Sequence, residues 1–93
     1  MAKFRKRPVV IEAVKVLDII RAHNDDFPKL VPIWIIAAYG EGTLDVNATS
    51  VDVRTLEGTM TGELDDWIIQ GVKGELYPCK PDIFEATYEK MED

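Results

Sequence analysis

Cys79 has the greatest nucleophilic potential in the chain, and it lies between Pro78 and Lys80. A neighbouring cation lowers the pKa of a thiol and favours the reactive thiolate. Nucleophilic catalysis also needs a base, and the only histidine, His23, is far away in the sequence. One cysteine and one histidine are too few to complete a zinc site. We therefore expect an inert cysteine, no catalytic residue, no metal centre and no cofactor, and an enzyme built on Cys79 is the least favoured alternative.

Two acidic clusters contain oxygen ligands of the kind that a hard cation prefers. They consist of Glu63, Asp65 and Asp66, and of His23, Asp25 and Asp26. Neither cluster has the spacing of a calcium-binding loop. We therefore interpret both as solvated turns.

Gly71 and Gly74 frame a short loop that contains Lys73. The backbone N–H groups of such a loop can cradle a phosphate, but the spacing matches neither a P-loop nor a dinucleotide-binding fingerprint. A tight hairpin is the favoured interpretation. Trp67 and Tyr77 flank the loop and would contact a protein or a nucleobase if they face solvent. The tentative binding residues are Trp67, Lys73, Tyr77, Cys79, Lys80 and Asp82.

The composition is that of an ordinary globular protein, with 46% hydrophobic and 30% charged residues in a chain of 93. The net charge is −6, yet four of the eleven basic residues, Lys3, Arg5, Lys6 and Arg7, precede Pro8. The remainder therefore carries seven basic and all seventeen acidic residues, a balance of −10. An acidic body disfavours nucleic-acid binding, and we interpret the basic start as a solvated lead-in to the first strand.

A single cysteine cannot form an internal disulfide, which fits a reducing compartment. The chain also lacks the run of about 18 apolar residues that a transmembrane helix requires. We therefore expect a cytoplasmic protein that has no contact with a membrane.

Residues 8–16 are apolar on both faces of a strand, which predicts a strand in the centre of the sheet. Residues 18–23 are typical of a short helical turn, with Asn24 as a polar stop. Residues 50–56 alternate cleanly and predict a half-exposed antiparallel strand with Val51 and Val53 inward. Short strands or loops are expected on either side of it, at residues 43–46 and 59–61.

Residues 32–40 are rich in β-branched side chains but carry the end signals of a helix. Proline at the first position and glycine after the last turn are the expected helical asymmetry. We therefore predict a helix. Its core-facing residues would be Ile33, Ile36 and Ala37, flanked by Trp34 and Tyr39.

The C-terminal third predicts a hairpin followed by a helix. Residues 67–69 form the first strand and residues 75–77 the return strand. Pro78 lacks a backbone donor, so the return strand must end there or lie at a sheet edge. A helix over residues 83–91 would begin at Asp82 as N-cap, with a capping box completed by Glu85 and an apolar face on the sheet formed by Ile83, Phe84, Thr87 and Tyr88.

Together these elements predict a single α+β domain over residues 1–93, with a small, mostly antiparallel sheet flanked by two or three helices.

Two blocks of the sequence carry a resemblance to a known family. They are residues 3–13, KFRKRPVVIEA, and residues 55–89, above all GVKGELYPCKPDIFEATYE. These blocks, about half of the chain, resemble the PGDYG family of small bacteriophage and prophage proteins. Where that family has its Pro-Gly-Asp-Tyr motif, this chain has Leu64-Asp65-Asp66-Trp67 and keeps only the acid and an aromatic ring. The resemblance implies a viral protein expressed in a bacterial cytoplasm and supplies no catalytic residue.

These observations lead to the hypothesis of a non-enzymatic phage accessory protein. It would be a small cytosolic module that binds a host or phage protein and modulates host physiology or a defence system, and it would be able to form a homo-oligomer. The alternative is a binder of a small, nucleotide-like ligand, held by Lys73, Lys80 and nearby aromatic rings.

Overall fold

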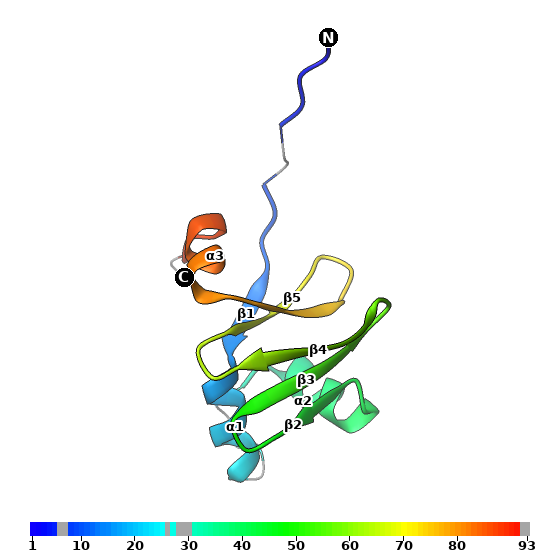
Figure 1. Ribbon diagram of the computed structural model, residues 1–93, viewed down its shortest axis with the longest axis vertical. Coiled ribbons are helices and arrows are strands. Elements are labelled where there is room, and N and C mark those ends of the chain that lie inside the picture. The colour runs from blue at the N-terminus through cyan, green and yellow to red at the C-terminus, as the bar shows by residue number, and fades with distance from the viewer. Residues whose placement is uncertain (6–7, 26, 28–30, 92–93) are drawn as a thin grey trace.

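Two small antiparallel sheets and three helices make up the fold, which confirms the predicted α+β class (Figure 1). The computed structural model describes residues 1–5, 8–25, 27 and 31–91. The elements are β1 (Glu12–Lys15), α1 (Val16–Asn24), α2 (Ile33–Glu41), β2 (Leu44–Val46), β3 (Ser50–Thr55), β4 (Gly58–Glu63), β5 (Trp67–Gln70), β6 (Leu76–Cys79) and α3 (Pro81–Thr87). The strands divide between sheet A, in the order β1-β5-β6, and sheet B, in the order β2-β3-β4.

Sheet B is a meander whose inner face is formed by the apolar residues of β3. Val51 and Val53 are fully buried, as their alternation predicted. The turn between β3 and β4 uses Gly58 at a φ of 119°, a conformation that favours glycine. The short strands expected on both sides of β3 are present as β2 and β4.

Sheet A is built on the predicted hairpin of β5 and β6, and β5 is its central strand. The prediction that the first strand lies in the centre is wrong. The helix α1 begins at Val16, so β1 is only four residues long and pairs with β5 alone. The preceding apolar residues Val9 and Val10 are consequently exposed, because no described strand lies beside them.

Pro78 lies inside β6, at the edge of sheet A. Gly71 N–H donates to the carbonyl of Glu75 at 2.7 Å, in register with the β5–β6 ladder. Bonded pairs alternate along an antiparallel ladder, so the pairs of odd-numbered residues exchange backbone hydrogen bonds. The backbone N–H and C=O groups of the even-numbered residues of β6 therefore point away from β5. Pro78, opposite Ile68, occupies an outward position, where its missing N–H costs no ladder bond.

The helix α2 confirms the predicted helix but buries a different face. Ile35 and Ala38 are buried, whereas Ile33, Ile36 and Ala37 are exposed. The helix is apolar all round, so its periodicity does not define a single core face. It ends at Gly42, at a φ of 79°.

The helix α3 begins two residues earlier than predicted and ends at Thr87. Pro81 occupies its first turn, Lys80 is the N-cap residue, and no side chain caps the helix. The predicted capping box at Asp82 is therefore wrong, because proline already fixes the first helical φ. None of the α3 residues is buried. The Phe84 ring stacks on Trp67 with ring centroids 4.3 Å apart, so one aromatic contact anchors α3 to sheet A.

The hydrophobic core lies between the two sheets and the helices α1 and α2. Gly62 of β4 lies where the sheets meet. A Cβ atom there would stand 3.0 Å from Val16 Cγ2, 3.2 Å from Ile68 Cδ1 and 3.4 Å from Pro78 Cβ. A larger residue at this position would crowd these three side chains. No helix in the described part of the chain is long and apolar enough to cross a bilayer.

Candidate functional site

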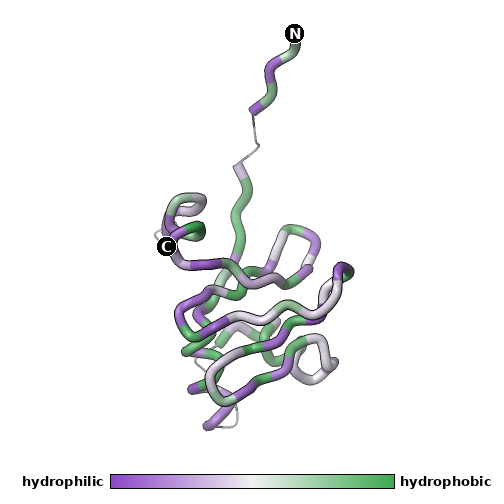
Figure 2. Tube along the Cα trace, viewed as in Figure 1, coloured by the Kyte–Doolittle hydropathy of each residue, from purple (hydrophilic) through white to green (hydrophobic). Residues whose placement is uncertain are grey.

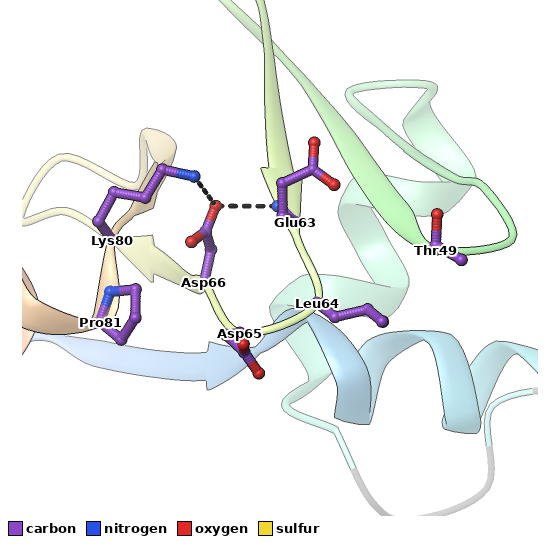
Figure 3. A pocket seen from close by; sticks show the side chains of 7 residues that line it. All are labelled: Thr49, Glu63, Leu64, Asp65, Asp66, Lys80 and Pro81. Atoms are coloured by element: carbon purple, nitrogen blue, oxygen red, sulfur yellow. Dashed lines mark hydrogen bonds and ion pairs between the residues drawn. The ribbon is translucent and has the colours of Figure 1, made fainter.

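Asp66 is the charged residue that the described part of the chain buries, with an exposed fraction of 3%. Its Oδ2 atom accepts hydrogen bonds from the Glu63 backbone N–H at 2.9 Å and from the Lys80 ammonium at 2.8 Å (Figure 3). Its carbonyl accepts the Val16 N–H at 3.0 Å. The interpretation of Asp66 as part of a solvated turn is therefore wrong. Instead Asp66 connects three parts of the fold. Its carboxylate bonds Glu63 at the end of β4 and Lys80 before α3, and its carbonyl bonds Val16 at the start of α1.

The ion pair affects the charge state of Lys80. The hydrogen bond that Lys80 donates to Asp66 raises the pKa of Lys80, and the negative charges of Asp66, Glu63 and Asp82 add to this effect. Lys80 therefore stays protonated, and its charge is already committed to a neighbour.

An open hollow of about 540 Å³ lies beside the ion pair (Figure 3). Its lining residues are Thr49, Glu63, Leu64, Asp65, Asp66, Lys80 and Pro81. We call it the acidic hollow, because its cation is paired with Asp66 while Glu63 and Asp65 are exposed. Such a charge balance attracts cations and repels phosphate. The nucleotide alternative therefore gains no support here, and it stays a prediction that heat-stability measurements with nucleotides can decide.

A second open hollow, of about 340 Å³, lies between β4 and β6 and shares Asp66 and Lys80 with the first. Its lining residues are Met60, Thr61, Asp66, Tyr77, Pro78, Cys79, Lys80 and Ile83. We call it the β4–β6 groove. Its apolar walls are open to solvent, since Met60 is 40% exposed and Ile83 is 56% exposed.

The edge of β4 that faces away from β3, which no described strand pairs with and which we call the free edge, borders this groove. Asn47 N–H donates to the Ser50 carbonyl at 2.8 Å, in register with the β2–β3 ladder. Bonded pairs alternate along an antiparallel ladder, so the odd-numbered residues of β3 exchange backbone hydrogen bonds with the even-numbered residues of β4. The backbone N–H and C=O groups of the odd-numbered residues of β4 therefore point to the free edge. Among these, Glu63 N–H is bonded to Asp66, whereas Thr61, a residue of the groove lining, directs its backbone groups to this edge by the same alternation.

The surroundings of Cys79 disfavour its thiolate form. Burial first, and then the carboxylates of Asp66 and Asp82, raise the pKa of Cys79. The expectation that Lys80 lowers it is wrong, because that ammonium is bound to Asp66. The Cys79 thiol donates to the Lys80 carbonyl at 3.6 Å. His23 lies elsewhere, with its Nε2 atom 3.1 Å from the Tyr39 hydroxyl.

The structure brings together only half of the tentative binding residues. Tyr77, Cys79 and Lys80 line the β4–β6 groove. Trp67 is covered by Phe84 of α3, and Lys73 lies in the exposed turn between β5 and β6. Asp82 is exposed in the first turn of α3 and outside the groove lining. Its negative charge nevertheless contributes to the raised pKa of Cys79.

Tyr77 lies on the same face of sheet A as α3, because Tyr77 is two residues from Cys79, which pairs with Trp67. Burial, followed by a hydrogen bond with Tyr88, raises the pKa of Tyr77 to about 12. The Tyr77 side chain is half-buried, so it contributes one wall of the groove and no separate stacking platform.

Sequence reasoning missed Met60, Thr61 and Ile83 as groove residues. Met60 is a large apolar residue in an otherwise polar strand, and this contrast is the signal that could have singled it out. No comparable signal marks Ile83, whose exposure depends on how α3 lies on sheet A.

The acidic clusters do not form a metal centre in the part of the chain that the structure describes. No three His, Cys, Asp or Glu side chains there are arranged to hold an ion. Asp26, from the cluster with His23, lies outside the described residues.

No protein-family model, curated protein or solved structure matches this chain. The resemblance to the PGDYG family therefore stays a prediction from the two sequence blocks.

Proposed function

We propose that this protein is a non-enzymatic protein-binding module, and that it holds an extended segment of its partner in the β4–β6 groove. The observation that carries the proposal is the coincidence of an open apolar groove with the free edge of β4. Strand addition to a sheet edge combines main-chain hydrogen bonds with pockets for alternate side chains. Both components lie side by side here.

The main-chain component is supplied by Thr61, whose backbone N–H and carbonyl point away from β3. On the opposite wall, Pro78 removes a donor from the outward side of β6. A segment in the groove therefore pairs with β4 and rests its side chains against β6.

The side-chain component defines the chemistry of the partner. Met60, Pro78 and Ile83 offer apolar contact for a large aliphatic or aromatic side chain. The volume of the groove lies at the small end of the range of about 300–1,000 Å³ that ligand pockets occupy. Glu63 and Asp65 in the adjoining acidic hollow favour a lysine or arginine beside that apolar residue.

The identity of the partner follows from the sequence resemblance. A small bacteriophage or prophage protein would meet host and phage proteins in a bacterial cytoplasm. The proposed partner is therefore a host or phage protein that exposes an extended segment with one large apolar and one basic residue. By binding it, the module would modulate host physiology or a defence system.

Affinity capture from a bacterial lysate, compared across matched variants, tests the proposal. We expect Met60→Glu and Ile83→Glu to abolish capture of a partner that the unaltered protein retains. Leu56→Glu, in the exposed turn between β3 and β4, should retain it. Equal retention by all three variants would contradict the proposal, and so would the absence of any partner of the folded protein.

A second pair of variants tests the backbone component. Thr61→Pro removes an edge N–H within the groove, and Thr59→Pro removes the equivalent group one pleat away, outside the lining. Neither change removes a β3–β4 ladder bond. We expect only Thr61→Pro to weaken capture, and equal effects would show that the partner does not pair with the β4 edge at the groove.

A further inference from the structure

The outer edge of β1 carries backbone groups that no described strand pairs with. Val16 N–H donates to the Asp66 carbonyl in register with the β1–β5 ladder. Bonded pairs alternate, so the even-numbered residues of β1 bond β5. The backbone groups of Ala13 and Lys15, and of Ile11 just before the strand, therefore point away from sheet A.

Residues 8–11, which directly precede β1, extend this edge beyond the body of the protein (Figure 1). Figure 2 shows a hydrophobic stretch in the trace that leads into β1. Val9 is 45% exposed and Val10 is 72% exposed. An apolar segment that continues an open sheet edge is a template for pairing with another chain.

We propose that two copies of this chain pair antiparallel through β1 and the preceding residues. The two three-stranded sheets then become one continuous sheet of six strands, in the order β6-β5-β1-β1-β5-β6. Twofold symmetry makes the interface self-complementary, as in most soluble dimers. This surface is separate from the β4–β6 groove, so the proposal does not depend on the proposed function.

The register follows from three constraints. Symmetric pairing places one residue on the twofold axis, and an axis at Val10 or earlier would leave Ala13 without a partner among residues 8–15. Ile11, Glu12 and Ala13 are therefore the candidates. Glu12 on the axis would face Glu12 of the second copy, and like charges directly opposite each other are destabilising. Ala13 on the axis would carry the ladder into α1, which begins at Val16. Ile11 therefore lies on the axis.

With Ile11 on the axis, the exposed apolar residues find partners. Val9 pairs with Ala13 of the second copy, and Val10 lies opposite Glu12. Pro8 lies at a non-bonded position at the end of the ladder, so its missing N–H removes no hydrogen bond.

Charge complementarity favours a second copy over an unrelated strand. In this register Pro8 lies near the end of β1 in the second copy, so the basic residues Lys3 and Arg5, a few positions before Pro8, can approach that end. Glu63 and Asp65, both exposed, lie at that end of the strand, because the turn that carries them joins Val16 through Asp66. Opposite charges within about a Debye length, roughly 8–10 Å, attract each other, and salt weakens the attraction.

Sedimentation velocity of the full chain over a concentration series tests the proposal. We expect a reversible dimer that weakens as salt is raised. Ile11→Pro removes two symmetry-related hydrogen bonds and should raise the dimer dissociation constant about 30-fold. Val10→Pro, one residue away, removes none and should change it much less. A monomer at every concentration would overturn the proposal, and equal effects of the two variants would overturn the register.

A covalent test remains informative if the proline variants fold poorly. In a Cys79→Ser background, Ile11→Cys places two thiols opposite each other with Cα atoms about 5.5 Å apart, which suits a disulfide. Val10→Cys places them on diagonal positions. Under oxidising conditions we expect a disulfide-linked dimer to form rapidly with Ile11→Cys only, and equal or absent cross-linking would overturn the assignment.

Discussion

The Lys80 ammonium lies 2.8 Å from Asp66 Oδ2, so a single ion pair connects the turn after β4 with the residue before α3. The pair is asymmetric, because the Asp66 side chain is 4% exposed and the Lys80 side chain is 56% exposed. Loss of Lys80 therefore leaves a buried carboxylate without its counter-ion, whereas loss of Asp66 leaves an ammonium that water can solvate. The same pair forms the boundary between the acidic hollow and the β4–β6 groove.

Asp66→Ala should lower the free energy of unfolding by about 2–3 kcal/mol, because it leaves the Glu63 N–H without its acceptor and Lys80 without its counter-ion. Lys80→Ala should also lower it, because it leaves the buried Asp66 carboxylate with the Glu63 N–H in place of its counter-ion. The midpoint of urea unfolding, at unchanged m value, measures both changes. Asp65→Ala, an exposed neighbour, serves as the control, and a similar loss in that variant would disprove the assigned role of Asp66.

Gly62→Ala should destabilise the fold by about 1–3 kcal/mol, because its new methyl group would press on Val16, Ile68 and Pro78. Gly40→Ala is the matched control in α2, where a Cβ atom meets nothing within 4 Å. That change should stabilise the protein by up to about 1 kcal/mol through helix propensity. Thermal unfolding of both variants distinguishes the expected destabilisation from the expected stabilisation. An unchanged unfolding temperature of Gly62→Ala would show that the sheets are not in close contact there.

Phe84→Ala should release α3 from sheet A, because the stacking on Trp67 is worth about 0.5–1.5 kcal/mol and no α3 residue is buried. Hydrogen exchange should accelerate across Pro81–Thr87 while β3 stays protected. Glu85→Ala, on the exposed side of the same helix, should leave the exchange unchanged. Protection of α3 that survives the loss of Phe84 would mean that other contacts anchor the helix.

Asp52 on sheet B should make stability depend on acid pH. Hydrogen bonds from Thr61 at 2.7 Å and from Asn47 at 3.2 Å hold the pKa of Asp52 below its ordinary value. A pKa that is lower in the folded protein contributes stability above the unfolded value of about 3.9. That contribution is lost as the pH falls through the folded pKa. NMR titration should show a higher pKa of Asp52 in Thr61→Val and no such rise in Thr59→Val.

Local patterns predicted the elements that depend on their own residues. The alternation around Val51 and Val53 predicted β3, because sheet B buries one face of that strand. The end signals predicted α2 despite its β-branched residues, although the cap is Gly42 and not Gly40. Both features follow from short-range geometry.

Features that depend on distant partners escaped prediction. The burial of Asp66 requires Lys80, fourteen residues away, and the hairpin that brings β6 back beside β5. The edge position of β1 is a property of strand order, which the apolar pattern of residues 8–16 does not specify. The core face of α2 was unpredictable because both of its sides are apolar.

Pro78 limits how far assembly through sheet A can proceed. A sheet with two open edges can polymerise into a filament, since each added copy presents a fresh edge. The proline deprives β6 of an outward N–H donor. In the described part of sheet A, only the β1 edge therefore offers both a backbone donor and a backbone acceptor at every outward residue. If two β1 strands pair as proposed, growth through this sheet therefore stops at the dimer, because Pro78 disfavours further pairing at the β6 edges that remain.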